Sequence, residues 1–101
     1  VTAEWFARPV GLISYGGISG GLRAIEALRI ILAELHTVTL RDTVSCNSPW
    51  RRFDEAGRII DPAEAATAEA AMAVFAHRLA WWADALADAR EARPYHPEDD
   101  Q

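Results

Sequence analysis

The chain has 101 residues, a mass of 11.1 kDa and a formal net charge of −5, with 50% apolar and 25% charged residues. This length allows one domain at most, and this composition excludes a disordered, collagen-like or disulfide-scaffold protein. The acidic balance argues against nucleic acid as a partner, because phosphate binding is driven by clustered Lys and Arg. No apolar run approaches the roughly 20 residues that a bilayer core requires, so no membrane partner is expected.

The chain contains a single cysteine, Cys46. One thiol can neither form an internal disulfide nor supply the two or more thiolates of a common structural zinc site. We therefore expect no metal site and a reducing, cytoplasmic location. The first residue is Val1 and the only methionine is Met72, so we also expect the chain to be part of a longer protein.

The first predicted element is a strand over residues 8–15. Val10, Leu12 and Ile13 form a short apolar run that opens after Pro9. Proline is tolerated at the first position of a strand, and the lack of polar alternation is typical of a sheet covered on both faces. The run therefore predicts a parallel strand.

A helix and a second strand follow. The helix is predicted from Gly20-Gly21 to about His36, since its apolar residues recur at spacings of three and four, namely Leu22, Ile25, Leu28, Leu32 and Leu35. The segment Thr37–Ser45 is rich in β-branched residues and predicts a strand. Strand, helix and strand within about 38 residues form a βαβ unit with a right-handed crossover.

Residues 46–60 show no sustained periodicity and are predicted to be a long loop, with a turn at Asp54–Gly57. Asp61, Pro62 and Glu64 then have the spacing of a capping box at the start of a helix. This last helix is predicted from Pro62 to Arg93, which is roughly 48 Å at about 1.5 Å per residue. Its apolar stripe consists of Ala68, Met72, Phe75, Leu79, Trp82 and Leu86.

A helix of this length exceeds a small domain, and two parallel strands with two helices do not close a core. The last helix therefore either projects into solvent at its end or packs along a partner subunit. We expect a homodimer through this helix, with Trp81-Trp82 in the core and the interface. Residues 94–101, with two prolines and three acids, are expected to form a flexible acidic tail.

The segment Ser14–Gly21 carries four glycines at the junction between the first strand and the helix. Open α/β sheets bind ligands at this edge, where glycines let backbone N–H groups approach a flat or anionic ligand. A tight turn without a ligand has the same composition. The glycine spacing does not match the dinucleotide fingerprint, and no lysine follows as in a P-loop.

A nucleophile elbow is a further alternative at this junction. Ser14 is followed by Gly16, but Leu12 occupies the position of the first glycine in G-x-S-x-G. A serine hydrolase would use Ser14 as its nucleophile, with His36, His77 or His96 as the base.

Elsewhere, Arg51 and Arg52 beside Trp50 are compatible with a nucleotide phosphate or with a simply solvated loop. His36, at a helix end, is expected to meet the negative end of the helix dipole, and His77 to be an exposed spacer.

Several runs together resemble the carboxyl-terminal half of the NADPH-dependent FMN reductase family. They are Glu4-Trp5-Phe6, Arg8 to Gly17, Gly20 to Ala24, Leu28-Arg29, and Phe53 to Gly57 ahead of Asp61. The resemblance implies a flavodoxin-like α/β fold, a three-layer parallel sheet of which residues 1–93 carry the β-α-β-α portion. The likeness extends from about Glu4 to Leu86.

By this resemblance, Ser14, Tyr15, Gly16 and Gly17 contact FMN, and hydride passes from NADPH or NADH through FMN to an acceptor such as flavin or quinone. The family's phosphate-binding loop after the first strand and its loop after the third strand are not among these 101 residues. A non-enzymatic, dimerising flavodoxin-like fragment is the alternative function. We also expect valine at Gly16 to weaken FMN binding at least about tenfold, by disfavouring a positive φ and by filling space against the flavin.

Overall fold

The computed structural model describes residues 3–95. Their elements follow in the order η1 (Ala3–Trp5), β1 (Pro9–Gly16), α1 (Leu22–Glu34), β2 (Val38–Asn47), η2 (Pro49–Arg51) and α2 (Pro62–Ala92), where η marks a 3-10 helix. The predicted β-α-β-α order is confirmed, and each helix or strand boundary lies within two residues of the prediction. None of the helices in the described part of the chain is long and apolar enough to cross a bilayer.

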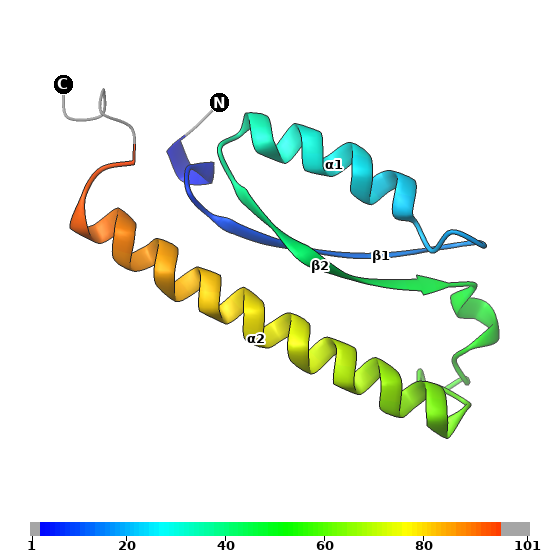
Figure 1. The fold of residues 1–101 in the computed structure, drawn as a ribbon. Helices are drawn as coiled ribbons and strands as arrows, with labels where there is room; N and C mark the ends of the chain where they lie inside the picture. Colours follow the sequence, from blue (N-terminus) through cyan, green and yellow to red (C-terminus); the bar gives the residue numbers. More distant parts are fainter. Residues whose placement is uncertain (1–2, 96–101) are drawn as a thin grey trace.

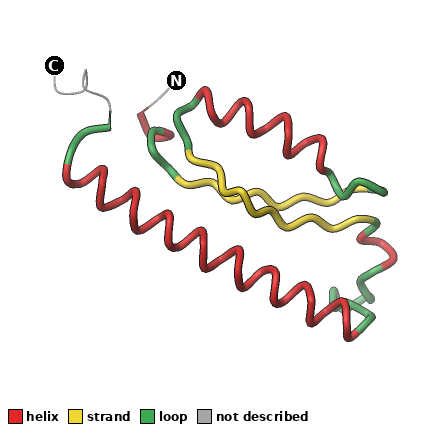
Figure 2. Tube along the Cα trace, viewed as in Figure 1, coloured by secondary structure: helices red, strands yellow, loops and turns green. Residues whose placement is uncertain are grey.

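The two strands form a parallel pair that lies between two helices (Figures 1 and 2). α1 lies along one side of the pair, and the longer α2 lies along the other side. This arrangement has three layers, and it agrees with part of a flavodoxin-like α/β fold.

β2 carries an irregularity in the middle of the sheet. The pairs on either side of it are Val10 with Thr39 and Leu12 with Thr43, so β2 contains two more residues than β1 at this point. The Nη2 of Arg29 in α1 donates to the carbonyl oxygen of Arg41 at 3.1 Å. A carbonyl group within the bulge is thereby satisfied by a helix side chain, which stabilises the irregular backbone.

The core on the α1 side consists of Leu12, Ile25 and Leu32, with Val10 and Leu35 partly buried against it. The predicted stripe is therefore confirmed at Ile25 and Leu32. It is wrong at Leu22 and Leu28, which are 47% and 42% exposed. Two strands are too narrow a surface to cover every residue of the stripe.

α2 packs against the sheet through Phe75, which is buried. A Cβ atom at Gly11 of β1 would overlap the ring of Phe75, so the absence of a side chain at Gly11 lets the ring approach the strand. Beside this contact, Arg78 of α2 donates to Asp42 of β2 at 2.6 Å. One aromatic ring and one ion pair therefore connect α2 to both strands near its middle.

The start of α2 makes half of the predicted capping box. The Oδ1 of Asp61 accepts from the N–H of Ala63 at 3.1 Å, as expected of an N-cap residue. Glu64 instead pairs with Nη1 of Arg52 at 2.8 Å. The reciprocal half of the box is therefore wrong, because a tertiary ion pair holds the glutamate side chain.

The predicted loop before α2 contains a hydrogen-bonded turn and a short 3-10 helix, η2. Asp54 and Arg58 form a backbone hydrogen bond of 2.8 Å, and Gly57, at φ 82°, donates to Asp54 at 3.0 Å. This geometry confirms the turn over residues 54–57. The turn closes a small hairpin whose ends, Phe53 and Ile59, form an antiparallel bridge.

The molecule is elongated, with dimensions of 55 × 24 × 21 Å. Its radius of gyration is 16.9 Å, against about 13 Å for a compact domain of 100 residues. Its accessible surface is 7472 Å², whereas a compact monomer of this mass exposes roughly 5,700 Å². Six apolar residues of the described chain are buried, namely Ala7, Leu12, Ile25, Leu32, Leu40 and Phe75. A narrow sheet thus leaves much apolar surface uncovered.

The end of the molecule where α1 and α2 finish is closed by aromatic side chains. Phe6, His36 and Tyr95 form an aromatic cluster of tilted and edge-on rings with centroids 4.9 to 5.7 Å apart, and His36 Nδ1 lies 3.2 Å from the Tyr95 hydroxyl. Arg90 donates to the carbonyl oxygen of Ala7 at 2.6 Å. His36 takes a left-handed φ of 64° just beyond α1, with its ring in this cluster. Tyr95 is therefore anchored, and residues 96–101 of the expected tail lie outside the described residues.

Candidate functional site

The glycine loop, residues 16–21, connects the carboxyl end of β1 to the start of α1. Gly20 and Gly21 have φ values of 66° and 85°, a left-handed conformation that L side chains rarely adopt. Gly21 is the N-cap of α1, and its carbonyl accepts from the N–H of Ile25 at 3.2 Å. These two glycines turn the chain from the strand into the helix.

Gly16 has a different role from the predicted one. Its φ is not positive, so the expected backbone penalty of valine at Gly16 is wrong. A Cβ atom there would lie 2.8 Å from the backbone nitrogen of Gly21, which makes Gly16 a close-packing position inside the loop. At Gly17, by contrast, a Cβ atom would meet no atom within 4 Å. Gly17 is therefore the position where a side chain would project into open space.

The Ser14 hydroxyl braces the glycine loop. Its Oγ donates to the carbonyl oxygen of Gly20 at 2.6 Å and lies 2.9 Å from Oγ of Ser45 on β2. The same side chain thus connects β1, the loop and β2. These two hydrogen bonds explain why a serine occupies position 14, and they require no catalytic role for its hydroxyl.

The serine hydrolase alternative finds no base beside Ser14 among the described histidines. His36 lies in the aromatic cluster at the opposite end of the molecule, and His77 is exposed on α2. His96 lies outside the described residues. Between residues 3 and 95, the hydrogen-bond partners of the Ser14 hydroxyl are Gly20 and Ser45, and neither is an imidazole. Within the described residues, the Ser14 hydroxyl therefore has a structural role, and neither His36 nor His77 supports the nucleophile interpretation.

The outer part of the glycine loop presents unpaired N–H groups. Within the described residues, no oxygen accepts from the backbone N–H groups of Gly17, Ile18 or Ser19. All three residues are exposed, and the Tyr15 side chain beside them is 76% exposed. Exposed N–H groups without an acceptor in the chain suit an electronegative ligand.

Of the four predicted flavin contacts, the structure brings Tyr15, Gly16 and Gly17 to the exposed end of β1. Ser14 instead points toward the loop's own backbone and lines a neighbouring groove. This groove has a volume of about 1050 Å³ and runs between the glycine loop, the end of β2 and the first turns of α2. Among its apolar lining residues are Ile18, Leu22, Val44, Phe53, Ala68 and Met72.

The Arg52 side chain connects the end of β2 to the first turn of α2. Its Nε donates to the carbonyl oxygen of Asn47 at 2.7 Å, its Nη2 contacts Oδ1 of the same residue, and its Nη1 pairs with Glu64. These contacts occupy the guanidinium, so the phosphate hypothesis for Arg52 is corrected. The sequence did not reveal that Asn47 and Glu64 hold Arg52, because contacts across 5 and 12 positions in an irregular segment leave no periodic signal.

The ion pair between Asp42 of β2 and Arg78 of α2 lies away from the glycine loop. The hydrogen bond from Arg78 holds the pKa of Asp42 below its ordinary value, and the nearby charge of Arg41 acts in the same direction. Burial opposes this shift. Because the carboxylate of Asp42 is paired with Arg78, we expect its negative charge to contribute to the stability of the folded chain. No group of three or more His, Cys, Asp or Glu side chains in residues 3–95 is arranged to hold a metal ion.

A parallel β-α-β unit covered on both faces, with a glycine loop at the carboxyl edge of its sheet, defines an α/β protein of the flavodoxin-like class. The family model for NADPH-dependent FMN reductase matches residues 1–51, half of the chain. The chain belongs to this family. The matched residues include β1, the glycine loop, α1 and β2. Comparison with curated proteins found no match, and comparison with solved structures found none either.

Proposed function

We propose that the protein is an NAD(P)H-dependent flavin oxidoreductase that binds FMN against the outer side of its glycine loop. The observation that carries the proposal is the exposed run of unpaired N–H groups at residues 17–19, with open space beside Gly17. The match to the FMN reductase family covers this same loop. A flat cofactor with electronegative ring atoms is the ligand that such a surface suits.

Each of the predicted contact residues has a distinct part in this proposal. Gly17 leaves room for the ring and presents its N–H, while Gly16 lets the loop fold back on Gly21. Tyr15 offers an exposed ring at the rim. Ser14 supports the loop from within through Gly20. The loop dipoles are held in place before the ligand arrives, so they stabilise negative charge without reorganisation.

FMN held against Tyr15, Gly16 and Gly17 would supply hydride transfer from NADPH or NADH to an acceptor such as a free flavin or a quinone. The chain's own contribution is to hold, orient and electrostatically tune the ring. No acid–base residue is required for this role. We place the protein in the cytoplasm, because Cys46 is a lone free thiol.

The visible absorption spectrum tests the proposal. Purified protein is reconstituted with FMN, desalted, and then treated anaerobically with NADPH and, separately, with NADH. We expect retained flavin absorbance that bleaches on addition of one or both donors. A spectrum with no retained flavin, together with no donor-dependent bleaching of added FMN, contradicts the proposal.

A second candidate function is a non-enzymatic module that forms a homodimer through α2. Val74 and Trp81 are 46% and 59% exposed and stand seven residues apart, on one face of this helix. The surface exceeds that of a compact monomer by roughly 1,800 Å², which is more than the roughly 800 Å² that each partner of a standard interface contributes. Analytical ultracentrifugation distinguishes the candidates, because a folded dimer that retains no FMN supports the module. A folded monomer argues against the homodimer in either function.

A further inference from the structure

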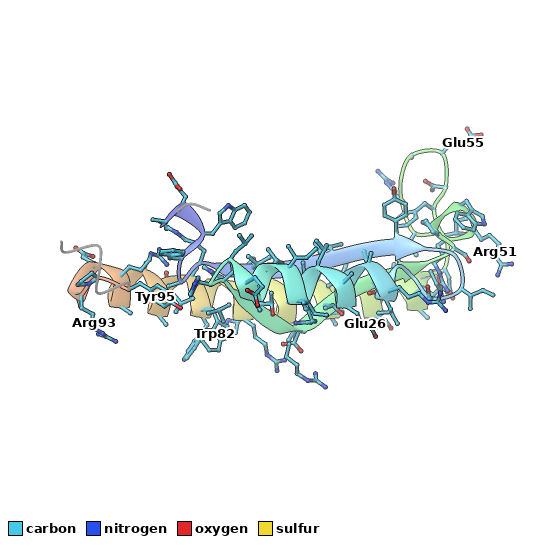
Figure 3. All side chains as sticks on the ribbon, turned by 90° about the horizontal axis from the view of Figure 1, so that it is seen from above. Glu26, Arg51, Glu55, Trp82, Arg93 and Tyr95 are labelled. Carbon is cyan, nitrogen blue, oxygen red and sulfur yellow. The ribbon has the colours of Figure 1, made fainter. Side chains whose placement is uncertain are left out.

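Trp50 and Arg51 are two neighbouring exposed side chains on η2. The indole of Trp50 is 69% exposed, although burying a tryptophan is among the largest apolar gains available to a chain. Arg51 is exposed too, and no carboxylate in the described part of the chain pairs with it. In Figure 3, Arg51 points away from the body at the end of the molecule that also carries Glu55.

Arg51 borders a hollow of about 240 Å³. The other lining residues are Ser48, Arg52, Ile60, Asp61 and Glu64. Of the two acids, Asp61 accepts from the N–H of Ala63, and Glu64 is neutralised by Arg52 at 2.8 Å. Arg51 is therefore the charged group of this hollow that has no intramolecular partner among residues 3–95. The guanidinium of Arg51 is thus the cation that a ligand of this hollow can contact, while Asp61 keeps its negative charge beside it.

η2 is fixed beside the glycine loop. The N–H of Ser48, the residue that precedes η2, donates to the carbonyl oxygens of Gly16 and Gly17 at 2.7 and 3.2 Å. Ser48 has a left-handed φ of 47°, which turns the chain sharply after β2. On the other side of η2, Arg52 is held by its hydrogen bond to Asn47 and its ion pair with Glu64. Trp50 and Arg51 therefore stand on a held turn that is hydrogen-bonded to the proposed flavin loop.

We propose that Trp50 and Arg51 form a purine-nucleotide site that takes the adenosine-phosphate end of the nicotinamide donor. The indole offers a stacking face to the purine, and the guanidinium offers paired donors to a phosphate group. This inference rests on the proposed function in one respect: the nicotinamide end of the same donor belongs at the glycine loop. The neighbouring positions of η2 and that loop allow one extended dinucleotide to reach both.

The test uses flavin-free protein and the nucleotides 2′,5′-ADP and 5′-ADP, with dissociation constants measured by isothermal titration calorimetry. Trp50→Ala is expected to weaken binding of both nucleotides by about tenfold, because the stacking face is lost. Arg51→Ala is expected to weaken, by about tenfold, the nucleotide whose phosphate it contacts. A loss confined to 2′,5′-ADP assigns the 2′-phosphate to Arg51, and a loss for both assigns the 5′-phosphates.

The matched controls are Trp81→Ala, an exposed tryptophan of α2, and Arg41→Ala, an exposed arginine of β2. Both should bind the two nucleotides as the parent does. The inference is overturned if the parent binds neither nucleotide, or if the η2 variants bind as tightly as the controls. FMN retention is measured on every variant and is expected to be unchanged. Nucleotide binding that persists in a protein that retains no FMN refutes the flavin function and leaves this site standing.

Discussion

The two ends of the molecule are built differently. At one end, Phe6, His36 and Tyr95 fill the space between the start of the chain and the last turn of α2, and Arg90 reaches across to a backbone carbonyl. At the other end, the glycine loop and η2 leave N–H groups and an indole uncovered. Figure 1 shows the two ends at opposite extremes of the strands.

This difference suggests that the aromatic end stabilises the fold and that the glycine end binds a ligand. At the aromatic end, left-handed backbone at Ala7 and His36 is stabilised by a hydrogen bond between them of 2.7 Å. At the glycine end, the loop turns at Gly20 and Gly21, which adopt a left-handed φ without strain, and Ser48 before η2 is the one left-handed residue with a side chain among the described residues of this end. The aromatic end should therefore respond to mutation through stability, and the glycine end through ligand affinity.

The largest effect is expected from Phe75→Ala, because this ring joins α2 to the sheet between the two ends. Loss of a buried phenylalanine costs about 3 kcal/mol of unfolding free energy or more. Urea denaturation followed by circular dichroism measures it. We expect both ends to loosen together, so FMN retention should fall as well. An unchanged denaturation midpoint would show that α2 does not depend on this contact.

Gly17→Val sharpens the comparison at the open end. A Cβ atom at Gly17 would meet no atom within 4 Å, so we expect the valine side chain to obstruct a ligand and leave the fold intact. We expect FMN affinity to fall at least about tenfold, equivalent to about 1.4 kcal/mol, with an unchanged thermal midpoint. Flavin fluorescence titration measures the affinity. Gly16→Ala is the contrasting variant, because its Cβ atom presses on Gly21 and should lower the thermal midpoint. Tight FMN binding by the Gly17 variant would remove the loop from the site.

Tyr95→Ala tests the closed end. The variant loses the ring contacts with Phe6 and His36, and aromatic pairs of this kind contribute about 1 kcal/mol. We expect a lower unfolding free energy and an unchanged FMN affinity. Tyr95→Phe keeps the ring and loses the hydrogen bond to His36, so its effect should be smaller. A change in FMN affinity with no change in stability would reverse the roles of the two ends.

The smallest effect is expected at Asp42, midway between the ends. Because pairing with Arg78 lowers the pKa of this carboxyl in the folded state, its contribution is present above its ordinary value near 3.8 and is lost as pH falls through the lower folded value. Asp42→Asn should therefore destabilise the protein modestly at pH 7 and not at pH values below the folded pKa. Urea midpoints at several pH values provide the measurement, with the exposed Asp88→Asn as control. A difference from the parent that persists at low pH would mean that the side chain acts through packing.

Much of the candidate site follows from local pattern. The glycine-rich junction after an apolar run places the loop at the carboxyl edge of β1, and the family resemblance assigned the flavin to it. The separate parts played by its glycines could not be predicted, because Gly16 and Gly21 touch only when the loop is folded. Likewise, nothing in the order of residues shows that Arg52 is paired with Asn47 and Glu64 while Arg51 has no partner within residues 3–95.

The sequence by itself determined the order and bounds of the strands and helices, the turn at residues 54–57 and the N-cap at Asp61. These features depend on periodicity and on hydrogen bonds between residues a few positions apart. Only the tertiary structure decided the bulge in β2, the closed aromatic end and the bracing of the glycine loop. The bonds responsible join residues 31 positions apart at Ser14 and Ser45, and 83 positions apart at Ala7 and Arg90. Such contacts form only when the whole chain packs, so no local pattern encodes them.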